Sequence, residues 1–187
     1  MIPTAAILTL PGADSRKGEV VSIKETLCRL YREMVSIQWP GRVDGGDVCE
    51  AGKHFFIGLS GRTNEAGAWQ LGELLTPYGY TSSFIDIRTL KGMLHLKSGL
   101  AYLGDNRLVV IEALAKREEF RGYDLLRVDA SEAYAANCVR VNDYILVAAG
   151  YPVFEQRLRG LGYKPIPLEM TEFQKMDGGL SCLSLRF

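Results

Sequence analysis

The spacing of hydrophobic and polar residues changes several times along the first forty residues of the chain. Residues Thr4–Leu10 are almost all apolar or small and predict a buried strand, which ends at the turn Pro11–Asp14. From Glu19 to Met34 apolar residues recur at steps of three and four, a spacing that predicts a helix with one buried face. The Pro-Gly pair after Trp39 ends this first part of the chain.

Three later segments share one order of predicted elements: two short strands joined by a tight turn, then a helix, then a third strand. The predicted hairpins are Asp47–Leu59, Leu100–Ile111 and Asn137–Ala148, the helices are Thr63–Leu75, Glu112–Glu119 and Val153–Leu161, and the third strands are Ser82–Ile87, Asp124–Val128 and Lys164–Leu168. The order recurs about every 40 residues, a period that is typical of propellers and other arrays. The pattern therefore predicts an α/β chain built from repeated units.

The two ends of the chain do not begin and finish with whole units. The strand at Thr4–Leu10 and the helix after it match the second strand and the helix of a unit, and Cys182–Phe187 matches the first strand of another. A circular array would need residues upstream of Met1 to close. We therefore expect one blade to be incomplete and its strand edges to favour association of copies or marginal stability.

Composition narrows the classes of protein to which the chain can belong. The 187 residues predict one domain, and 22 Lys and Arg balance 22 Asp and Glu, so no overall charge favours nucleic acid or an anionic membrane. No apolar run is long enough to span a bilayer, and the first residues lack the pattern of a signal peptide. The four cysteines are scattered without a Cys-x-x-Cys pair, which favours reduced thiols in the cytoplasm over a zinc cluster or a disulfide framework.

Residues with catalytic potential occur at the boundaries between units. Asp44 precedes the first hairpin, His95 precedes the second, and Cys182 follows the turn Asp177–Gly179. Equivalent boundaries of a cyclic array converge on its axis, so a carboxylate, an imidazole and a thiol could meet in one central pocket. Taken singly, His95 could be a core histidine, Cys182 a small buried hydrophobe and each Asp-Gly-Gly a simple turn.

The other cysteines and the second histidine have less distinctive settings. His54 lies within a predicted strand, where a structural role is the more ordinary one. We interpret the three remaining cysteines as packing residues: Cys28, Cys49 and Cys138.

Two arginines follow predicted strands on polar loops. Arg16 and Arg62 carry guanidinium groups that suit two-point capture of a carboxylate, although a solvated surface arginine is the commoner case. In the second loop, Thr63 or Asn64 could cap the helix that follows. The sequence contains no Gly-rich phosphate loop and no metal-ligand spacing.

Five of these segments, taken in order, carry the motifs of a known family. They are Pro11-Gly-Ala-Asp-Ser-Arg-Lys-Gly-Glu19, Asp44-Gly-Gly-Asp-Val48, Phe56-Ile-Gly-Leu-Ser-Gly-Arg-Thr-Asn64, Leu94-His-Leu-Lys-Ser98 and Asp177-Gly-Gly-Leu-Ser-Cys182. The chain resembles the dimethylarginine dimethylaminohydrolases, which belong with arginine deiminases and amidinotransferases to a superfamily of guanidino-modifying enzymes. The resemblance implies a pentein-type, five-bladed α/β propeller of strand-strand-helix-strand units that needs no cofactor and no metal.

The resemblance also implies roles for individual residues. Cys182 corresponds to the nucleophile and His95 to the general acid and base, while Asp44 corresponds to a carboxylate that holds the substrate's guanidinium group. Arg16 and Arg62 correspond to residues that bind the α-carboxylate of an amino-acid substrate. The carbonyl near Met176 would accept a hydrogen bond from the substrate's α-amino group.

The chain departs from the family at its beginning. Family members have an upstream segment whose acidic motif also contacts the guanidinium, and the printed sequence starts after it. We therefore expect a single propeller domain over residues 1–187 that is N-terminally shortened relative to the family. A hydrolase of methylated arginine is the first interpretation; an arginine deiminase-like hydrolase, or a catalytically impaired remnant with a binding role, is the alternative.

Overall fold

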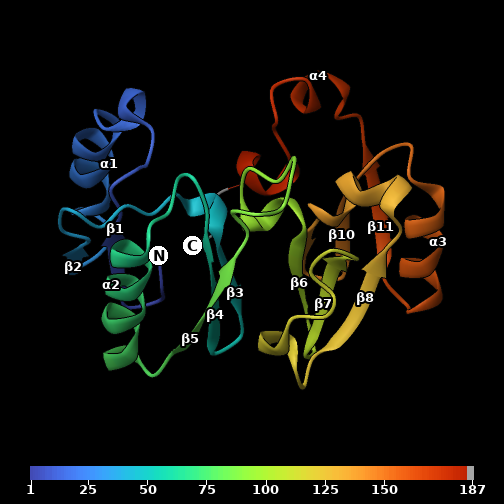
Figure 1. Ribbon diagram of the computed structural model, residues 1–187, viewed down its shortest axis with the longest axis horizontal. Helices are drawn as coiled ribbons and strands as arrows, with labels where there is room; N and C mark the ends of the chain where they lie inside the picture. The colour runs from blue at the N-terminus through green and yellow to red at the C-terminus, as the bar shows by residue number, and fades with distance from the viewer. Residues whose placement is uncertain (185–187) are drawn as a thin grey trace.

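The computed structural model describes residues 1–184 and arranges their strands in four small sheets placed side by side (Figure 1). Three of the sheets have three strands each, and the fourth, near the N-terminus, has two. In each three-stranded sheet the middle strand pairs antiparallel with the strand before it and parallel with the strand after it. This shared order confirms the repeated unit that the sequence predicts.

The three complete units lie close to their predicted positions. Their sheets are β3 (Val48–Ala51), β4 (His54–Leu59) and β5 (Thr81–Asp86); β6 (Leu100–Gly104), β7 (Arg107–Ile111) and β8 (Asp124–Val128); and β9 (Val139–Val141), β10 (Tyr144–Ala148) and β11 (Lys164–Leu168). Every hairpin turn contains a residue with positive φ, namely Gly52, Asp105, Asn106 or Asn142. Gly, Asn and Asp adopt this backbone conformation at low cost, which explains why the turns could be recognised in the sequence.

Helices cross over between the parallel strands of two units. Helix α2 (Glu65–Leu75) connects β4 to β5, and α3 (Pro152–Gly160) connects β10 to β11. Asn64 caps α2, because its side-chain oxygen accepts a hydrogen bond from the Gly67 amide at 2.9 Å. A short helix α4 (Thr171–Gln174) follows β11.

The first predicted helix is shorter than its apolar spacing indicates. Helix α1 (Glu19–Leu27) ends seven residues before Met34, and the segment after it forms strand β2 (Glu33–Ser36). Strand β2 pairs parallel with β1 (Ala5–Leu8), so the segment supplies the third strand of this unit. Of the residues in α1 only Leu27 is buried, so most of the expected apolar face contacts solvent.

The helix predicted at Glu112–Glu119 is absent from the described part of the chain. After Ile111 the backbone makes successive turns and one short 3₁₀ helix, Glu118–Phe120, before β8 begins. The buried side chains of Leu114 and Phe120 fix this connection against the core between β4 and β7. Tertiary packing therefore overrides the helix propensity of Ala115–Glu119.

Buried apolar side chains fill the space within and between neighbouring sheets. The largest clusters join the β3–β5 sheet to the β6–β8 sheet, and the β6–β8 sheet to the β9–β11 sheet. Cys49 and Cys138 belong to these clusters, as expected, and burial raises the pKa of the Cys138 thiol to about 12. The packing role expected of Cys28 is wrong, because this residue is exposed at the end of α1.

Among residues 1–184 there is no helix long and apolar enough to cross a bilayer. This finding agrees with the absence of a long apolar run in the sequence.

Candidate active site

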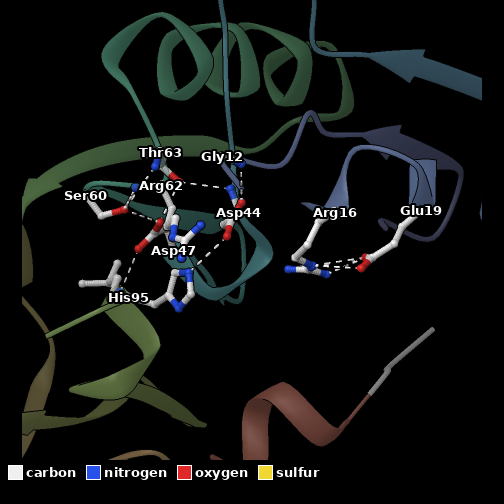
Figure 2. A network of polar contacts seen from close by, with 10 residues as sticks. Gly12, Arg16, Glu19, Asp44, Asp47, Ser60, Arg62, Thr63 and His95 are labelled. Atoms are coloured by element: carbon white, nitrogen blue, oxygen red, sulfur yellow. Dashed lines mark hydrogen bonds and ion pairs between the residues drawn. The ribbon is translucent and has the colours of Figure 1, made fainter. Parts of the chain in front are cut away.

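Asp44 and His95, from loops 51 residues apart, meet between two sheets. His95 Nε2 lies 3.3 Å from Asp44 Oδ2, and Asp44 Oδ1 accepts a hydrogen bond from the Gly12 amide at 2.7 Å (Figure 2). Each loop directly precedes the first strand of a unit: Asp44 comes just before β3, and His95 comes just before β6. These two boundaries therefore meet, as the repeat pattern predicts for them.

The Asp44 carboxyl is 4% exposed and has a pKa below its usual value of 3.8. Burial alone would raise the pKa of this group. The hydrogen bonds from His95 and Gly12, together with the positive charges of His95 and Arg16, outweigh burial and favour the ionised form. Asp44 therefore presents a carboxylate to His95 at neutral pH.

Arg16 ends a short 3₁₀ helix, Asp14–Arg16, between β1 and α1. Its guanidinium donates to Glu19 through Nη2 at 2.9 Å, in a pair that is more than half exposed. This hydrogen bond is the main cause that raises the pKa of Arg16; burial opposes it, and negative charge at Asp44 and Cys182 adds to it. Arg16 and Asp44 line one hollow. The pairing with Glu19 was not foreseen from the sequence.

Arg62 is half-buried beside the pair formed by Asp44 and His95 (Figure 2). Its amide donates to Ser60 Oγ at 3.0 Å, which fixes the backbone of the loop between β4 and α2. The loop also packs directly against Gly12, because a Cβ at that position would overlap the backbone of Arg62. The segment that carries Arg16 and the segment that carries Arg62 are thus neighbours.

Cys182 is exposed and lies in a 3₁₀ helix, Leu180–Leu183. The strand predicted over Cys182–Phe187 is wrong for its described part up to Leu183, and residues 185–187 lie outside the described residues. Among residues 1–184 no hydrogen bond joins the Cys182 thiol to His95 or Asp44. The structure thus brings Asp44 and His95 into contact and, among residues 1–184, does not join Cys182 to them by a hydrogen bond.

The segment before Cys182 is held in place by two residues that the sequence analysis did not single out. Tyr134 donates from its hydroxyl to the Gly178 carbonyl at 2.7 Å, and Asn137 Oδ1 accepts from the Ser181 amide at 2.9 Å. Gly179 leaves room for the Asn137 side chain, with which a Cβ would overlap. Neither residue could be recognised from its neighbours in the sequence, because the segment that Tyr134 and Asn137 contact lies 44 residues further along the chain.

Met176 lies on the turn before this segment, with a side chain that is 83% exposed. Its amide donates to the Phe173 carbonyl at 3.0 Å, and the next residue, Asp177, has a positive φ of 56°.

An open hollow of about 520 Å³ adjoins the site. Arg16, Glu19, Asp44 and Gly45 line its polar side, and side chains of β1 and α1 such as Ile7 and Ile23 line its apolar side. The volume suits a ligand of amino-acid size. Among residues 1–184 no group of three or more His, Cys, Asp or Glu side chains could hold a metal ion.

Asp47 is a further residue that the sequence analysis did not single out. Its carboxylate is completely buried and accepts from Ser60 Oγ at 2.7 Å, Thr63 Oγ1 at 2.6 Å and the Leu96 amide at 2.9 Å (Figure 2). These partners belong to the loops of Arg62 and His95. The second acid of Asp44-Gly-Gly-Asp47 was the available signal, since it immediately precedes a buried strand.

The chain is similar to dimethylarginine dimethylaminohydrolases in sequence and in structure. It is 43% identical to the enzyme of Pseudomonas aeruginosa over 97% of this chain and 71% of that protein, and 32% identical to the enzyme of Streptomyces coelicolor over 97% of this chain and 68% of that protein. A cysteine-to-serine mutant of the P. aeruginosa enzyme complexed with citrulline superimposes with a TM-score of 0.93 at 40% identity, and covers 100% of this chain and 72% of that one. No protein-family model matches.

Proposed function

The chain belongs to the dimethylarginine dimethylaminohydrolase family and has its pentein-type α/β propeller fold, and we propose that it hydrolyses the guanidinium group of methylated arginine to citrulline and an amine. The observation that supports this most strongly is the contact between His95 Nε2 and the buried Asp44 carboxylate at 3.3 Å, beside a hollow that Arg16 also lines. A base, a carboxylate and a thiol are the groups that covalent guanidinium chemistry needs.

In the first half of the reaction, Cys182 is the nucleophile. The guanidinium lies between Cys182 and Asp44, and its positive charge favours the thiolate. The thiolate attacks the guanidinium carbon and forms a C–S bond. His95, as imidazolium, gives its proton to the leaving nitrogen, so the C–N bond breaks with release of a neutral amine. The product of this half-reaction is an S-alkylthiouronium on Cys182.

In the second half, water replaces the sulfur. His95 is now neutral and takes a proton from a water molecule, whose oxygen attacks the thiouronium carbon. The C–S bond then breaks, the thiolate is regenerated, and the hydroxyl that came from water loses its second proton to solvent, which leaves the ureido group of citrulline. Asp44 supports both halves, because a carboxylate next to His95 stabilises the imidazolium that the first half consumes and the second half restores.

We assign selection of an amino-acid substrate to the two arginines. Arg16 and Arg62 would hold the substrate's α-carboxylate by two-point hydrogen bonds, and the main-chain carbonyl of Met176 would accept from its α-amino group. Arg16 can do so only by sharing or exchanging its present partner, Glu19. An exposed ion pair of this kind contributes at most about 1 kcal/mol, which a substrate carboxylate could replace.

The direct test is product formation by the purified chain. With asymmetric dimethylarginine we expect citrulline and dimethylamine in equal amounts, and with arginine we expect little citrulline or ammonia. Cys182→Ser should abolish turnover, whereas Cys28→Ser, a change of the other exposed cysteine, should leave it unchanged. Ammonia from arginine as the main product would instead identify a deiminase.

Absence of citrulline from both substrates, in a chain shown to be folded by circular dichroism, would refute the proposed activity. It would favour the alternative of a binding role without catalysis, which binding of citrulline measured by calorimetry would then test.

We also propose a cytoplasmic location and association of copies. The scatter of the cysteines supports the first, and the outer strand edges of the two-stranded sheet support the second. Recovery of the chain in a membrane or secreted fraction would refute the first, and a monomer mass by light scattering would refute the second.

A further inference from the structure

The carboxylate of Asp47 is the most completely buried charged group next to the proposed site. It is 0% exposed and accepts three hydrogen bonds, two from hydroxyls and one from a main-chain amide. Among residues 1–184 no cation pairs with it. Since a buried carboxylate is costly without full hydrogen bonding, its three donors must stay in place.

The two hydroxyls leave little freedom for another arrangement. Ser60 Oγ accepts from the amides of Arg62 and Thr63 at 3.0 and 3.1 Å, and Thr63 Oγ1 accepts from the Asp44 amide at 3.1 Å. Each hydroxyl has a single hydrogen, and each directs it to Asp47. Only a group that accepts without donating completes this network.

The network reaches three residues of the proposed site by three routes. Through Thr63 it holds the backbone of Asp44, through Ser60 it holds the backbone of Arg62, and through the Leu96 amide it holds the segment that begins with His95. Asp47 itself is fully buried behind these loops and does not reach the surface that a substrate would contact.

We propose that Asp47 is a positioning residue that fixes Asp44, Arg62 and His95 relative to one another. The inference rests on the proposed function, because it assigns Asp47 a part in that reaction. A displacement of about 1 Å in a reacting group can cost about a hundred-fold in rate, so a shared anchor for three such groups has a large effect on turnover.

The site around Asp47 has no room for a longer side chain. A Cβ on Gly58 would lie 2.8 Å from Leu96 Cβ and 3.1 Å from Asp47 Oδ1, which shows how closely β4 approaches the carboxylate. Asn is the substitution that preserves size. Whichever way the amide is turned, its NH₂ group faces a donor, either the two hydroxyls or the Leu96 amide, so Asp47→Asn removes at least one of the hydrogen bonds without creating a cavity.

The test measures kcat and KM for dimethylarginine per folded chain, with the folded fraction taken from denaturant unfolding. We expect Asp47→Asn to lower kcat/KM about a hundred-fold. Leu158→Ala is the control, because it empties a buried site in the cluster under α3 and lowers stability away from the proposed site. The control should change kcat/KM per folded chain by no more than about two-fold.

Two milder variants test the link to Asp44 and the link to Arg62 one at a time. They also replace Asp47→Asn in the test if that variant does not fold. Thr63→Val removes the hydroxyl that joins Asp47 to Asp44 and should act mainly on kcat; Ser60→Ala removes the link to Arg62 and should act mainly on KM. Because Thr63 acts through Asp47, the Asp47→Asn/Thr63→Val double variant should be little worse than Asp47→Asn alone. Additive losses, or equal effects of both single variants on kcat and KM, would contradict the proposal.

A second readout does not depend on turnover. In wild type the Leu96 amide should be protected from hydrogen exchange and shifted downfield by its bond to a carboxylate, and Asp47→Asn should reduce both effects, with a smaller change in Leu158→Ala. If wild type makes no citrulline but the amide responds, the proposed function fails and the anchoring is confirmed. If Asp47→Asn retains wild-type kcat/KM, or loses only as much as Leu158→Ala, the positioning role is refuted.

Discussion

Gly46 fills a position next to His95 where any side chain would force the imidazole to move. A Cβ there would lie 2.6 Å from His95 Cγ, which is closer than real Cβ atoms approach a ring. Its neighbour Gly45 has nothing within 4 Å of the corresponding position. The Asp-Gly-Gly turn therefore needs its second glycine for packing against the imidazole and not for its own backbone conformation.

We expect Gly46→Ala to push His95 away from Asp44 and lower kcat about ten- to a hundred-fold. Gly160→Ala, at an exposed glycine at the end of α3 with nothing within 4 Å of an added Cβ, is the control and should keep kcat within about two-fold of wild type. Steady-state kinetics on both variants makes the comparison, and similar kcat values for the two would contradict the packing role of Gly46.

The lowered pKa of Asp44 predicts how the free energy of unfolding changes with pH. A carboxyl whose pKa is lower in the folded chain stabilises that state above its unfolded pKa, near 3.8, and the stabilisation is lost as pH falls through the folded pKa. Wild type should therefore be more stable than Asp44→Asn at pH 6–7, and the difference should shrink steadily below about pH 4.

Denaturant unfolding of both proteins between pH 7 and pH 3 measures this difference. A difference that stays constant over the whole range would show that the Asp44 charge does not contribute to folding. Glu73→Gln, on the exposed face of α2, serves as the control and should leave the pH dependence of the free energy of unfolding between pH 7 and pH 3 close to that of wild type.

At the scale of the single element, Glu132 stabilises the start of α3. Its two carboxylate oxygens accept from the Val153 and Phe154 amides at 3.1 and 2.6 Å, the first free donors of the helix. The side chain comes from another segment and is buried, so it replaces a local cap, which Tyr151 does not provide.

We expect Glu132→Gln to reduce the free energy of unfolding by about 1–2 kcal/mol, because one of the two amides loses a charged acceptor. Glu73→Gln, on the exposed face of α2, should change it by less than about 0.5 kcal/mol. Urea unfolding measures both, and an equal effect of the two changes would contradict the capping role.

Elements with strong local signals could be predicted from the sequence, and elements set by distant contacts could not. The hairpins of the three complete units were predicted because Gly, Asn and Asp mark their turns. The sequence predicts a helix where β2 lies, because the apolar residues of this segment continue the helical spacing of α1. Only the pairing with β1 makes it a strand. The segment after Ile111 has helix-forming residues, yet burial of Leu114 and Phe120 imposes turns.

At the scale of the whole molecule, the proposed site draws on segments from every part of the chain. Asp44, His95 and Cys182 were predicted together because each lies at a unit boundary, and for the first two the contact is confirmed. Asp47, Tyr134 and Asn137 could not be predicted, because each acts through partners that the fold alone brings near. The catalytic roles of Asp44, His95 and Cys182 stay predictions. So do the binding roles of Arg16, Arg62 and Met176.

The anchoring of the Cys182 segment by Asn137 can be tested by substitution. Asn137→Ala removes the acceptor for the Ser181 amide and should lower kcat about ten-fold, because Cys182 gains freedom to move. Asn142→Gly is the control: Asn142 lies in a hairpin turn with a φ of 55°, which Gly adopts readily. A kcat for Asn137→Ala within two-fold of this control would contradict the anchoring.

The central claim is that Cys182 carries the substrate's carbon during turnover. Acid quench of wild type within milliseconds of mixing with dimethylarginine, followed by mass spectrometry of the intact chain and its peptides, tests this directly. We predict a thiouronium adduct on the peptide that contains Cys182, its disappearance as citrulline accumulates, and its absence in Cys182→Ser. An adduct on Cys28, Cys49 or Cys138, or citrulline formation by Cys182→Ser at the wild-type rate, would contradict the account.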